Sequence, residues 1–350
     1  MPRPWFRIDP RLGGEADFDE LVEQCRSRGL RLVLDGVFSH VGAEYPGVAK
    51  ALAEGPGAGA GELFDIDWDA PGGPAPRVFE GHASLVRLNH ASQETVDFVA
   101  KVMKHWLDRG IDGWRLDAAY SVAPEFWAQV TGQVRRHHPD CWLLGEVLHG
   151  DYVAFVADSG VDSVTQYELW KAIWSSINDR NFFELDHALR RHNQFLDAFL
   201  PNTFVGNHDV TRIASRVGAD GAILALAILM TVGGIPSIYY GDEQGYVGVK
   251  EERLGGDDDI RPVFPSSPSQ FSPLGAHLLR AHQDLIGLRR RHSWLVRART
   301  EPLHLENERL IYRSFAPDGS THLDVEIDLA GSPAAIIRDD SGEELWSHHS

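Results

Sequence analysis

The chain has 350 residues, which is long enough for one barrel or for two ordinary domains. Hydrophobic residues make up 43% and charged residues 24%, the composition of a soluble globular protein. The formal net charge of -18 argues against nucleic acid or an anionic membrane surface as a partner. A neutral ligand such as a sugar remains compatible with this charge.

Neither targeting nor disulfide bonding is indicated by the sequence. Residues 1–6 contain no apolar signal segment, and no run of 18 or more apolar residues follows. We therefore expect a cytoplasmic protein that does not span a membrane. Cys25 lies in a helical pattern and Cys141 opens a strand, so we expect no disulfide between them.

Taken along the chain, a unit of helix, glycine and apolar strand recurs. Helices over 17–28 and 95–109 are each followed by a glycine and then by strands over 30–37 and 111–116. Strands alternating with helices predict a parallel α/β sheet, either open or closed. The pattern gives six strands, whereas a closed (β/α)8 barrel has eight. The remaining expected strands are 142–147, 161–166, 203–206 and 235–240, and the remaining helices are 124–138, one from 168, 184–200, 219–232 and 274–291.

Two segments depart from this alternation. Residues 41–92 are rich in Gly, Pro and Ala and are long for a plain loop, which predicts an inserted subdomain beside the site. From residue 294 short strands over 310–315, 322–329 and 334–337 predict a small β-domain. The expected organisation is a catalytic domain over 1–293, the insert over 41–92 and a C-terminal domain over 294–350.

Several of the expected strands end in an acidic residue. Asp117 closes the run Gly113-Trp-Arg-Leu-Asp117, and Glu146 follows the next strand along the chain. Because the carboxyl ends of parallel strands form the active-site face, we expect the two carboxylates to be neighbours there. A retaining glycosidase uses two such carboxyl groups about 5–5.5 Å apart, one as nucleophile and one as acid.

The residues around this pair suit those two roles. Arg115 lies two residues before Asp117, on the same side of the strand, where it would hold the carboxylate ionised. Glu146 follows an apolar approach, residues 143–145, that would favour its protonated form.

Two further strands end in comparable groups. Asp35 and His40 follow one strand, and Asn207-His-Asp209 follows another. Asp209 would be a third carboxylate able to bind sugar hydroxyls, and His40 and His208 would be hydroxyl donors. Taken singly, such an acid is more often a cap or turn former and such a histidine a core residue. Four groups at strand ends, in one order, favour the catalytic interpretation.

The motifs resemble those of the α-amylase family, glycoside hydrolase family 13. The resemblance covers about residues 6–262 and the motifs stand in the family's order: Asp35-Gly-Val-Phe-Ser-His40, Leu85-Val-Arg-Leu-Asn89, Gly113-Trp-Arg-Leu-Asp117, Glu146, Asn207-His-Asp209 and Gly234-Ile-Pro-Ser-Ile-Tyr-Tyr-Gly-Asp-Glu243. It implies a (β/α)8 TIM barrel that cleaves α-glucosidic bonds of α-glucans through a covalent glycosyl-enzyme.

The resemblance also implies roles for individual residues. Asp117 would be the nucleophile, Glu146 the general acid/base and Asp209 the transition-state stabiliser. The implied substrate-binding residues are Arg115, His40, His208 and Asn207, with Asp35 supporting the site from behind. Arg87 and the segment 255–262 are similar to the branch of neopullulanases, cyclomaltodextrinases and maltogenic amylases, which act on short or cyclic glucans and often dimerise.

The chain departs from the family's pattern at two places. Ser39 stands where an asparagine usually precedes the motif histidine and ligates a structural calcium, so we expect no cofactor and no calcium. The match begins at residues 6–10, which in the family follow the second strand. The resemblance therefore implies a barrel without its first two strands, and we favour a misassigned start over a decayed gene.

There are three alternatives to a hydrolytic function. A truncated barrel could bind glucans without cleaving them, and a glucanotransferase or a trehalose-forming isomerase would use the same acid pair. A nucleotide-binding doubly wound sheet is disfavoured, because the glycine run at 55–61 neither follows a strand nor opens a helix. The sequence leaves linkage, chain length and oligomeric state open.

Overall fold

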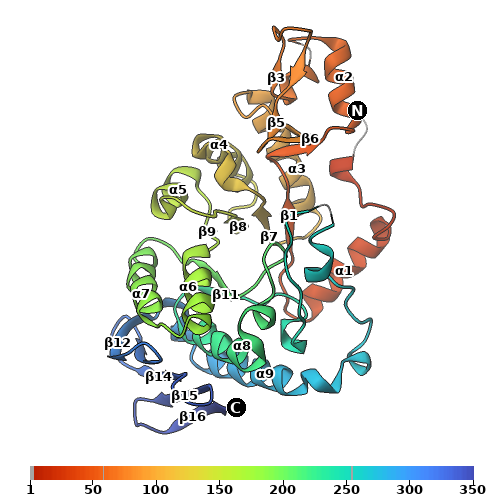
Figure 1. Cartoon of the computed structure of the whole chain (residues 1–350). Coiled ribbons are helices and arrows are strands. Elements are labelled where there is room, and N and C mark those ends of the chain that lie inside the picture. Colours follow the sequence, from red (N-terminus) through yellow and green to blue (C-terminus); the bar gives the residue numbers. More distant parts are fainter. Residues whose placement is uncertain (1–3, 58, 254) are drawn as a thin grey trace. The chain divides into compact units, whose positions relative to one another are not determined.

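In the computed structural model, residues 4–57, 59–253 and 255–350 are described. The chain divides into two compact units, Met1–Val164 and Thr165–Ser350, each treated by itself below (Figure 1). The helices of unit 1 are α1 (Glu15–Ser27), α2 (Pro46–Glu54), α3 (Gln93–Asp108), α4 (Pro124–Arg135) and α5 (Tyr152–Ser159). Those of unit 2 are α6 (Tyr167–Asn178), α7 (Phe183–Leu196), α8 (Ile213–Thr231) and α9 (Ala276–Arg291).

Unit 1 contains a parallel sheet in the order β1-β7-β8-β9, formed by β1 (Val33–Gly36), β7 (Gly113–Leu116), β8 (Trp142–Gly145) and β9 (Ser163–Val164). Helix α3 connects to β7, and α4 connects to β8, which is the expected alternation of helix and strand. Leu116 and Leu143 are fully buried, so the short apolar strands form the interior of this unit.

Glycines and caps set the ends of the unit 1 helices as expected from the sequence. Gly29 has a φ of 68° just after α1, and its neighbour Leu30 donates its N–H to the Cys25 carbonyl at 2.9 Å, closing the last turn. Ser92 caps α3 by accepting the Glu94 N–H at 3.2 Å. Cys25 and Cys141 are both free.

The insert forms a lobe of unit 1 with its own core. Strands β2 (His40–Gly42), β6 (His82–Arg87) and β5 (Val78–Phe79) make an antiparallel sheet, and β3 (Ile66–Asp67) pairs with β4 (Ala75–Pro76). Figure 1 shows this lobe, with α2, beyond the parallel sheet of the same unit. Its core contains Val41, Val48, Phe64 and Leu88.

Unit 2 begins with helices α6 and α7 and contains a second parallel pair, β10 (Asn202–Phe204) and β11 (Ile235–Ser237). Helix α8 is the centre of its core: residues 221–231 are all buried. By length and composition α8 could cross a membrane, but 61% of its most apolar window is buried inside the protein. Its chain kinks at Gly218, where φ is 74°.

The chain ends in a five-stranded antiparallel meander, which confirms the expected C-terminal β-sheet. Its strands are β12 (Arg299–Leu305), β13 (Arg309–Phe315), β14 (His322–Asp328), β15 (Ala334–Asp339) and β16 (Glu344–His349). The buried residues alternate along β13 and β14, with Tyr312 and Val325 paired on the inner face. Ser314 donates to the carbonyl of Thr231 at 2.6 Å, which joins the sheet to the end of α8.

The expected elements are present, but several of their bounds were wrong. The strands are shorter than expected: β1 and β7 begin later, β8, β10 and β11 end earlier, and β9 is shorter at both ends. Gly218 interrupts α8 with non-helical dihedral angles, so its long apolar part begins after this glycine, as the expected start at 219 indicated, and a short additional helical segment from Ile213 precedes it. The short helices α2 and α5 and the strands β12 and β16 were not predicted. In the described parts of the chain the parallel strands form a four-stranded and a two-stranded sheet, with a single parallel bridge between Thr165 and Asn202, and no closed barrel.

The basic end of α9 contacts another helix, α8. Arg289 is largely buried and donates to the carbonyls of Met230, Val232 and Gly234 at 2.8–2.9 Å. It therefore satisfies the carboxyl end of α8 rather than that of its own helix. Burial lowers the pKa of Arg289 to about 10.

Candidate active site

Three of the predicted acids lie at the carboxyl ends of adjacent parallel strands in unit 1. Asp35 in β1 is opposite Arg115 in β7, and Leu116 is opposite Gly145 in β8. The ladder continues past the strands, since the Asp117 N–H donates to the Gly36 carbonyl at 3.0 Å and the Glu146 N–H to the Leu116 carbonyl at 2.9 Å. Asp117 and Glu146 are therefore neighbours across two strand ends, as the sequence predicted.

Arg115 joins the three carboxylates. Its Nη1 donates to Asp35 Oδ1 at 2.9 Å and to Asp117 Oδ1 at 2.8 Å, and its Nη2 lies 2.7 Å from Glu146 Oε1. A planar guanidinium can serve several carboxylates because its donors point in fixed, different directions. The prediction that Arg115 pairs with Asp117 is thus confirmed, and the same side chain also orients the other acid.

Burial makes this cluster electrostatically strong. The side chains of Arg115 and Glu146 are only 14% and 7% exposed. Burial acts to lower the pKa of Arg115, but the charges of Glu146, Asp35 and Asp117 outweigh it and hold that pKa above its ordinary value. The guanidinium is consequently a permanent cation within the site.

The surroundings of Glu146 differ from the apolar setting that the sequence indicated. Leu143 and Leu144 are buried as expected, but the carboxyl itself meets polar groups. Its Oε2 accepts the Ala118 N–H at 2.8 Å while its Oε1 pairs with Arg115. Leu143 points to the face opposite Glu146 and Leu144 to the same face, because the side chains of a strand alternate between its two faces.

The backbone directly after Asp117 is held in an unusual conformation. Ala118 has φ 45° and ψ 38°, in the left-handed region that residues other than glycine rarely adopt. This turn directs the Ala118 N–H at Glu146, and the Ala118 carbonyl accepts from Ser121 Oγ at 2.7 Å. The strained turn therefore fixes the two acids with respect to each other.

His40 begins β2 on the insert side of the same group. Its Nδ1 lies 2.8 Å from Ser39 Oγ, and its ring stacks on Phe79 at 4.3 Å. Burial lowers the pKa of His40, and the charge of Asp117 acts in the opposite direction. A neutral imidazole with one nitrogen held by a serine keeps the other nitrogen to serve a hydroxyl group.

Tyr120 and Glu80 belong to this region but were not predicted from the sequence. The Tyr120 hydroxyl donates to Glu80 Oε1 at 2.8 Å, which links the loop after Asp117 to the hairpin between β5 and β6. Burial, together with the Glu80 carboxylate, raises the pKa of Tyr120 above its ordinary value. The sequence hint was Glu80-Gly81, a turn pair, where Glu80 has φ 46°.

In unit 2 the predicted residues Asn207, His208 and Asp209 follow β10. Asn207 Nδ2 donates to the Tyr167 hydroxyl at 2.9 Å, and its Oδ1 accepts the Asp209 N–H at 2.9 Å. His208 Nε2 lies 3.1 Å from Asp209 Oδ2. Asn207 thus shapes the loop, whereas His208 and Asp209 are about one-third exposed.

Arg261 holds Asp209 in unit 2. Its Nη2 lies 2.8 Å from Asp209 Oδ1 and 3.0 Å from Asp257 Oδ2, and its Nε donates to the His208 carbonyl at 2.8 Å. No local pattern in the sequence indicates Arg261 as a partner of Asp209, because the two are 52 positions apart.

A buried ion pair lies beneath this loop. Arg212 and Asp242, both almost fully buried, meet at 3.0 Å. Arg212 also donates to the carbonyls of Tyr240 and Ile260. A Cβ on Gly206 would approach Asp242 Oδ2 to 3.0 Å, so this glycine permits the close packing that positions residues 207–209. Burial raises the pKa of Asp242 to about 7, although Arg212 lowers it.

The structure thus brings together two groups of predicted residues. Unit 1 assembles Asp35, His40, Arg115, Asp117 and Glu146, and unit 2 assembles Asn207, His208 and Asp209. Among the described residues, no group of three or more His, Cys, Asp or Glu is arranged to hold a metal ion. At Ser39, where the family's calcium ligand would stand, the hydroxyl is engaged with His40.

Comparison with known proteins identifies the family. The model of the alpha-amylase catalytic domain matches residues 3–58 and 78–270. The chain belongs to the alpha-amylase family. Residues 59–77, between the two matched segments, lie in the insert.

Relatives in this family include the predicted branch. The chain is 28% identical to neopullulanase 2 of Thermoactinomyces vulgaris over 98% of its own length and 59% of the relative's. It is 29% identical to a cyclomaltodextrinase of a Bacillus species over 83% of its own length and 52% of the relative's. The chain therefore spans between half and three-fifths of the length of these relatives.

A solved structure shows the same fold. The cyclic alpha-maltosyl-(1→6)-maltose hydrolase of Arthrobacter globiformis, in its ligand-free form, superposes with a TM-score of 0.83 at 23% identity. The match covers 99% of this chain and 81% of that structure. The fold is accordingly that of the alpha-amylase family, a (β/α)8 barrel with a C-terminal β-sheet domain, of which the described residues supply the parallel strands β1 and β7 to β11.

Proposed function

We propose that the protein is a retaining glycoside hydrolase that cleaves α-glucosidic bonds of maltooligosaccharides, cyclodextrins or related α-glucans. The observation that carries this proposal is the cluster of Asp117, Glu146 and Arg115 at the ends of adjacent parallel strands. Family membership supports it, because the relatives named above are a neopullulanase and a cyclomaltodextrinase.

In the proposed mechanism Asp117 attacks the anomeric carbon while Glu146 protonates the departing glycosidic oxygen. Glu146 then takes a proton from water, which hydrolyses the glycosyl-enzyme and releases Asp117. Arg115 keeps Asp117 ionised and aligned for attack, and the Ala118 turn holds Glu146 beside it.

The remaining predicted residues would bind the sugar. His40 and His208 would donate to or accept from ring hydroxyls, and Asp209 would bind hydroxyls more tightly as the ring flattens. Asp35 supports Arg115 by accepting from the same Nη1 that binds Asp117, and Asn207 shapes the loop that carries Asp209.

We also propose the domain boundaries 1–293, 41–92 and 294–350, and we propose that a homodimer is formed, as expected from the branch. A cytoplasmic location is proposed as well, since one relative is named an intracellular maltogenic amylase. Neither nucleic acid nor a membrane is proposed as a partner, because the net charge of -18 repels both.

Product analysis with maltotriose and a cyclodextrin tests the activity. We expect glucose and maltose, with the α-anomer formed first in an NMR time course, since a double displacement retains configuration. Products longer than maltotriose in the incubation with maltotriose alone would indicate glucan transfer instead. The absence of any product, with glucan binding retained, would indicate a non-catalytic binding protein.

Rescue by azide then distinguishes the catalytic roles of the two acids. In Asp117→Ala, azide should replace the missing nucleophile and give the inverted glycosyl azide from an activated glycosyl fluoride. In Glu146→Ala, azide should attack the glycosyl-enzyme and give the retained product. If both variants gave the same anomer, the assignment of Asp117 and Glu146 to different steps would be wrong.

A further inference from the structure

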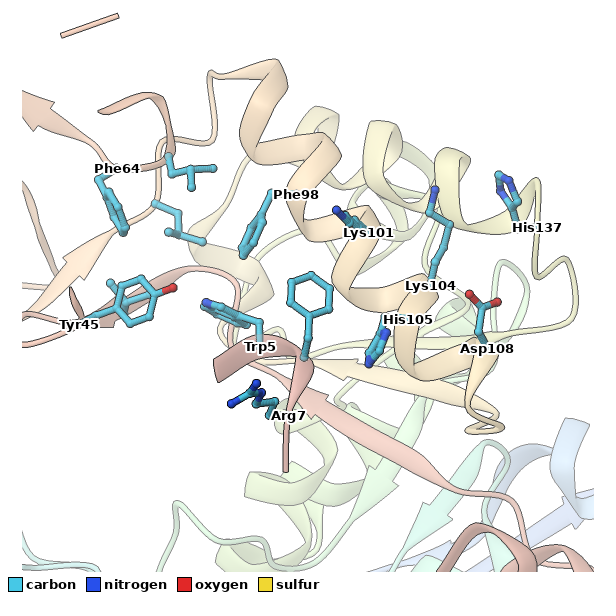
Figure 2. Close-up of a pocket in the computed structure, with 14 residues that line it drawn as sticks. Trp5, Arg7, Tyr45, Phe64, Phe98, Lys101, Lys104, His105, Asp108 and His137 are labelled. Atoms are coloured by element: carbon cyan, nitrogen blue, oxygen red, sulfur yellow. The ribbon is translucent and has the colours of Figure 1, made fainter. Parts of the chain in front are cut away.

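Unit 1 contains a cleft of about 830 Å³ that the proposed mechanism does not use. It lies between the insert, helix α3 and residues 5–7 (Figure 2). Val41 lines it, whereas its neighbour His40 belongs to the Arg115 cluster. Because successive residues of a strand point to opposite faces, the cleft and the cluster lie on different sides of β2. A volume of this size is typical of sites for small organic ligands.

The cleft has two chemically different ends. Figure 2 shows Tyr45, Phe64, Trp5 and Phe98 at the end formed by the insert. Flat apolar rings of this kind stack against sugar or nucleobase rings. Toward the other end, α3 presents Lys101 and Lys104 along the cleft.

The second end is positively charged in a strongly acidic protein. Lys101 and Lys104 are two of the five lysines in the sequence. Arg7 also lines the cleft, but it lies beside Trp5, away from the two lysines (Figure 2). Within the described part of the chain, none of these three forms an ion pair with a carboxylate. Asp108 is the one acid among the described lining residues, and His138 Nε2 binds it at 2.9 Å.

One residue that lines the cleft, His105, has a buried nitrogen. Its Nε2 is shielded from solvent and has no hydrogen-bond partner among the described residues. The His105 ring packs edge to face with the Phe6 ring, and the Lys101 ammonium lies 6.0 Å from the centre of the Phe6 ring.

We propose that this cleft binds a small phosphate monoester that carries a ring, with the phosphate at Lys101 and Lys104 and the ring against the aromatic end. The two lysines give the anion its charge complement, and their local positive field in a chain of net charge -18 concentrates such an anion there. Phe98 and Lys104 are six residues apart on α3, about 9 Å, so one monosaccharide phosphate or nucleotide can reach both ends.

Calorimetric titration tests the proposal and separates the two sources of such a ligand. The probes are glucose 6-phosphate and AMP, with glucose, adenosine and inorganic phosphate as partial ligands. We expect at least one ester to bind at least tenfold more tightly than its neutral parent and than inorganic phosphate. Binding of the sugar ester alone would identify a sugar phosphate, and binding of AMP alone a nucleotide.

Matched variants locate the site. Lys101→Glu with Lys104→Glu should weaken ester binding at least tenfold, since both side chains are at the surface and should tolerate the change. The control pair, Lys50→Glu with Lys171→Glu, carries the same change in net charge and should stay within twofold. Circular dichroism would confirm that both double variants are folded.

Three results would overturn the proposal: no binding of either ester, inorganic phosphate binding as tightly as the esters, or equal losses in the two double variants. The outcome is independent of the proposed hydrolysis, because Asp117→Asn should bind the ester as the unaltered chain does. An inactive chain that still binds the ester at Lys101 and Lys104 would contradict the proposed hydrolase activity but not the proposed ester site in the cleft.

Discussion

The two groups of predicted acids are each organised by an arginine, but in opposite surroundings. Arg115 is 14% exposed and pairs with three carboxylates, whereas Arg261 is 42% exposed and pairs with Asp209 and Asp257. The first group is attached to three paired strands, and the second lies on loops. The buried cluster is therefore built to hold fixed geometry, and the exposed one can exchange its partners for water or a ligand.

The contrast arises from what surrounds each arginine. A buried ion pair loses its hydration on folding, so its geometry must be good and removing one partner leaves a charge without compensation. An exposed pair is solvated before and after, so its net contribution is small. The two clusters should therefore respond very differently to the loss of their arginines.

Replacing Arg115 by Met should have the largest effect. It removes the cation that Asp117 and the buried Glu146 share, which should lower the free energy of unfolding by about 3–5 kcal/mol. Urea unfolding at pH 7 measures this. Arg87→Met is the control, since Arg87 is 43% exposed and 3.8 Å from Asp65, and should change stability by less than about 0.5 kcal/mol. Similar losses in the two variants would contradict the role assigned to burial.

The dependence of stability on pH tests a different buried group, His192 in unit 2. It is fully buried, with Nε2 donating to the Gly233 carbonyl at 2.9 Å, and burial lowers its pKa to about 4. Since the unfolded chain then binds more protons, stability should be complete above pH 6.5 and should fall as the pH drops toward 4.

The loss expected from His192 over this window is about 3 kcal/mol. His192→Gln, which cannot be protonated, should show a flatter stability profile between pH 6.5 and 4. Urea unfolding at half-unit pH steps measures both slopes, and identical slopes would show that His192 is not the titrating group.

The sequence predicted the strand-end acids because each follows a short apolar run, and such runs can be identified locally. It predicted Arg115 with Asp117 because two residues in one strand share a side. It did not predict the contact of Glu146 with Arg115, which depends on the register between β7 and β8. It also missed Arg261 with Asp209, because only the folded loops bring these distant residues together.

The bounds of elements were least predictable where local pattern and tertiary contact disagree. A short helical segment from Ile213 precedes Gly218, where the non-helical backbone separates it from the expected helix that follows. Strand β9 has two residues where a strand over 161–166 was expected, because only Ser163 and Val164 pair with β8.

A smaller effect is expected where unit 1 joins its insert to the acid cluster. Tyr120→Phe removes the hydrogen bond to Glu80, which should cost about 1–2 kcal/mol because the acceptor is charged and the pair is partly exposed. Glu80→Gln keeps an acceptor and should lose less. Thermal unfolding would rank the two variants, and a larger loss for Glu80→Gln would contradict the hydrogen bond as the cause.

Replacing Arg261 by Met should have the smallest effect on stability, less than about 1 kcal/mol, because the pair with Asp209 is exposed. Its effect should instead appear in kinetics, since Asp209 loses the partner that orients it for sugar hydroxyls. We expect KM for maltotriose to rise several-fold, with a smaller change in kcat. Arg253→Met is the matched control, because the ion pair of Arg253 with Glu251 is exposed as well. If Arg261→Met lost as much stability as Arg115→Met, exposure would not explain the difference between the two clusters. If the Arg261 and Arg253 variants had equal kinetics, Arg261 would not be a positioning residue.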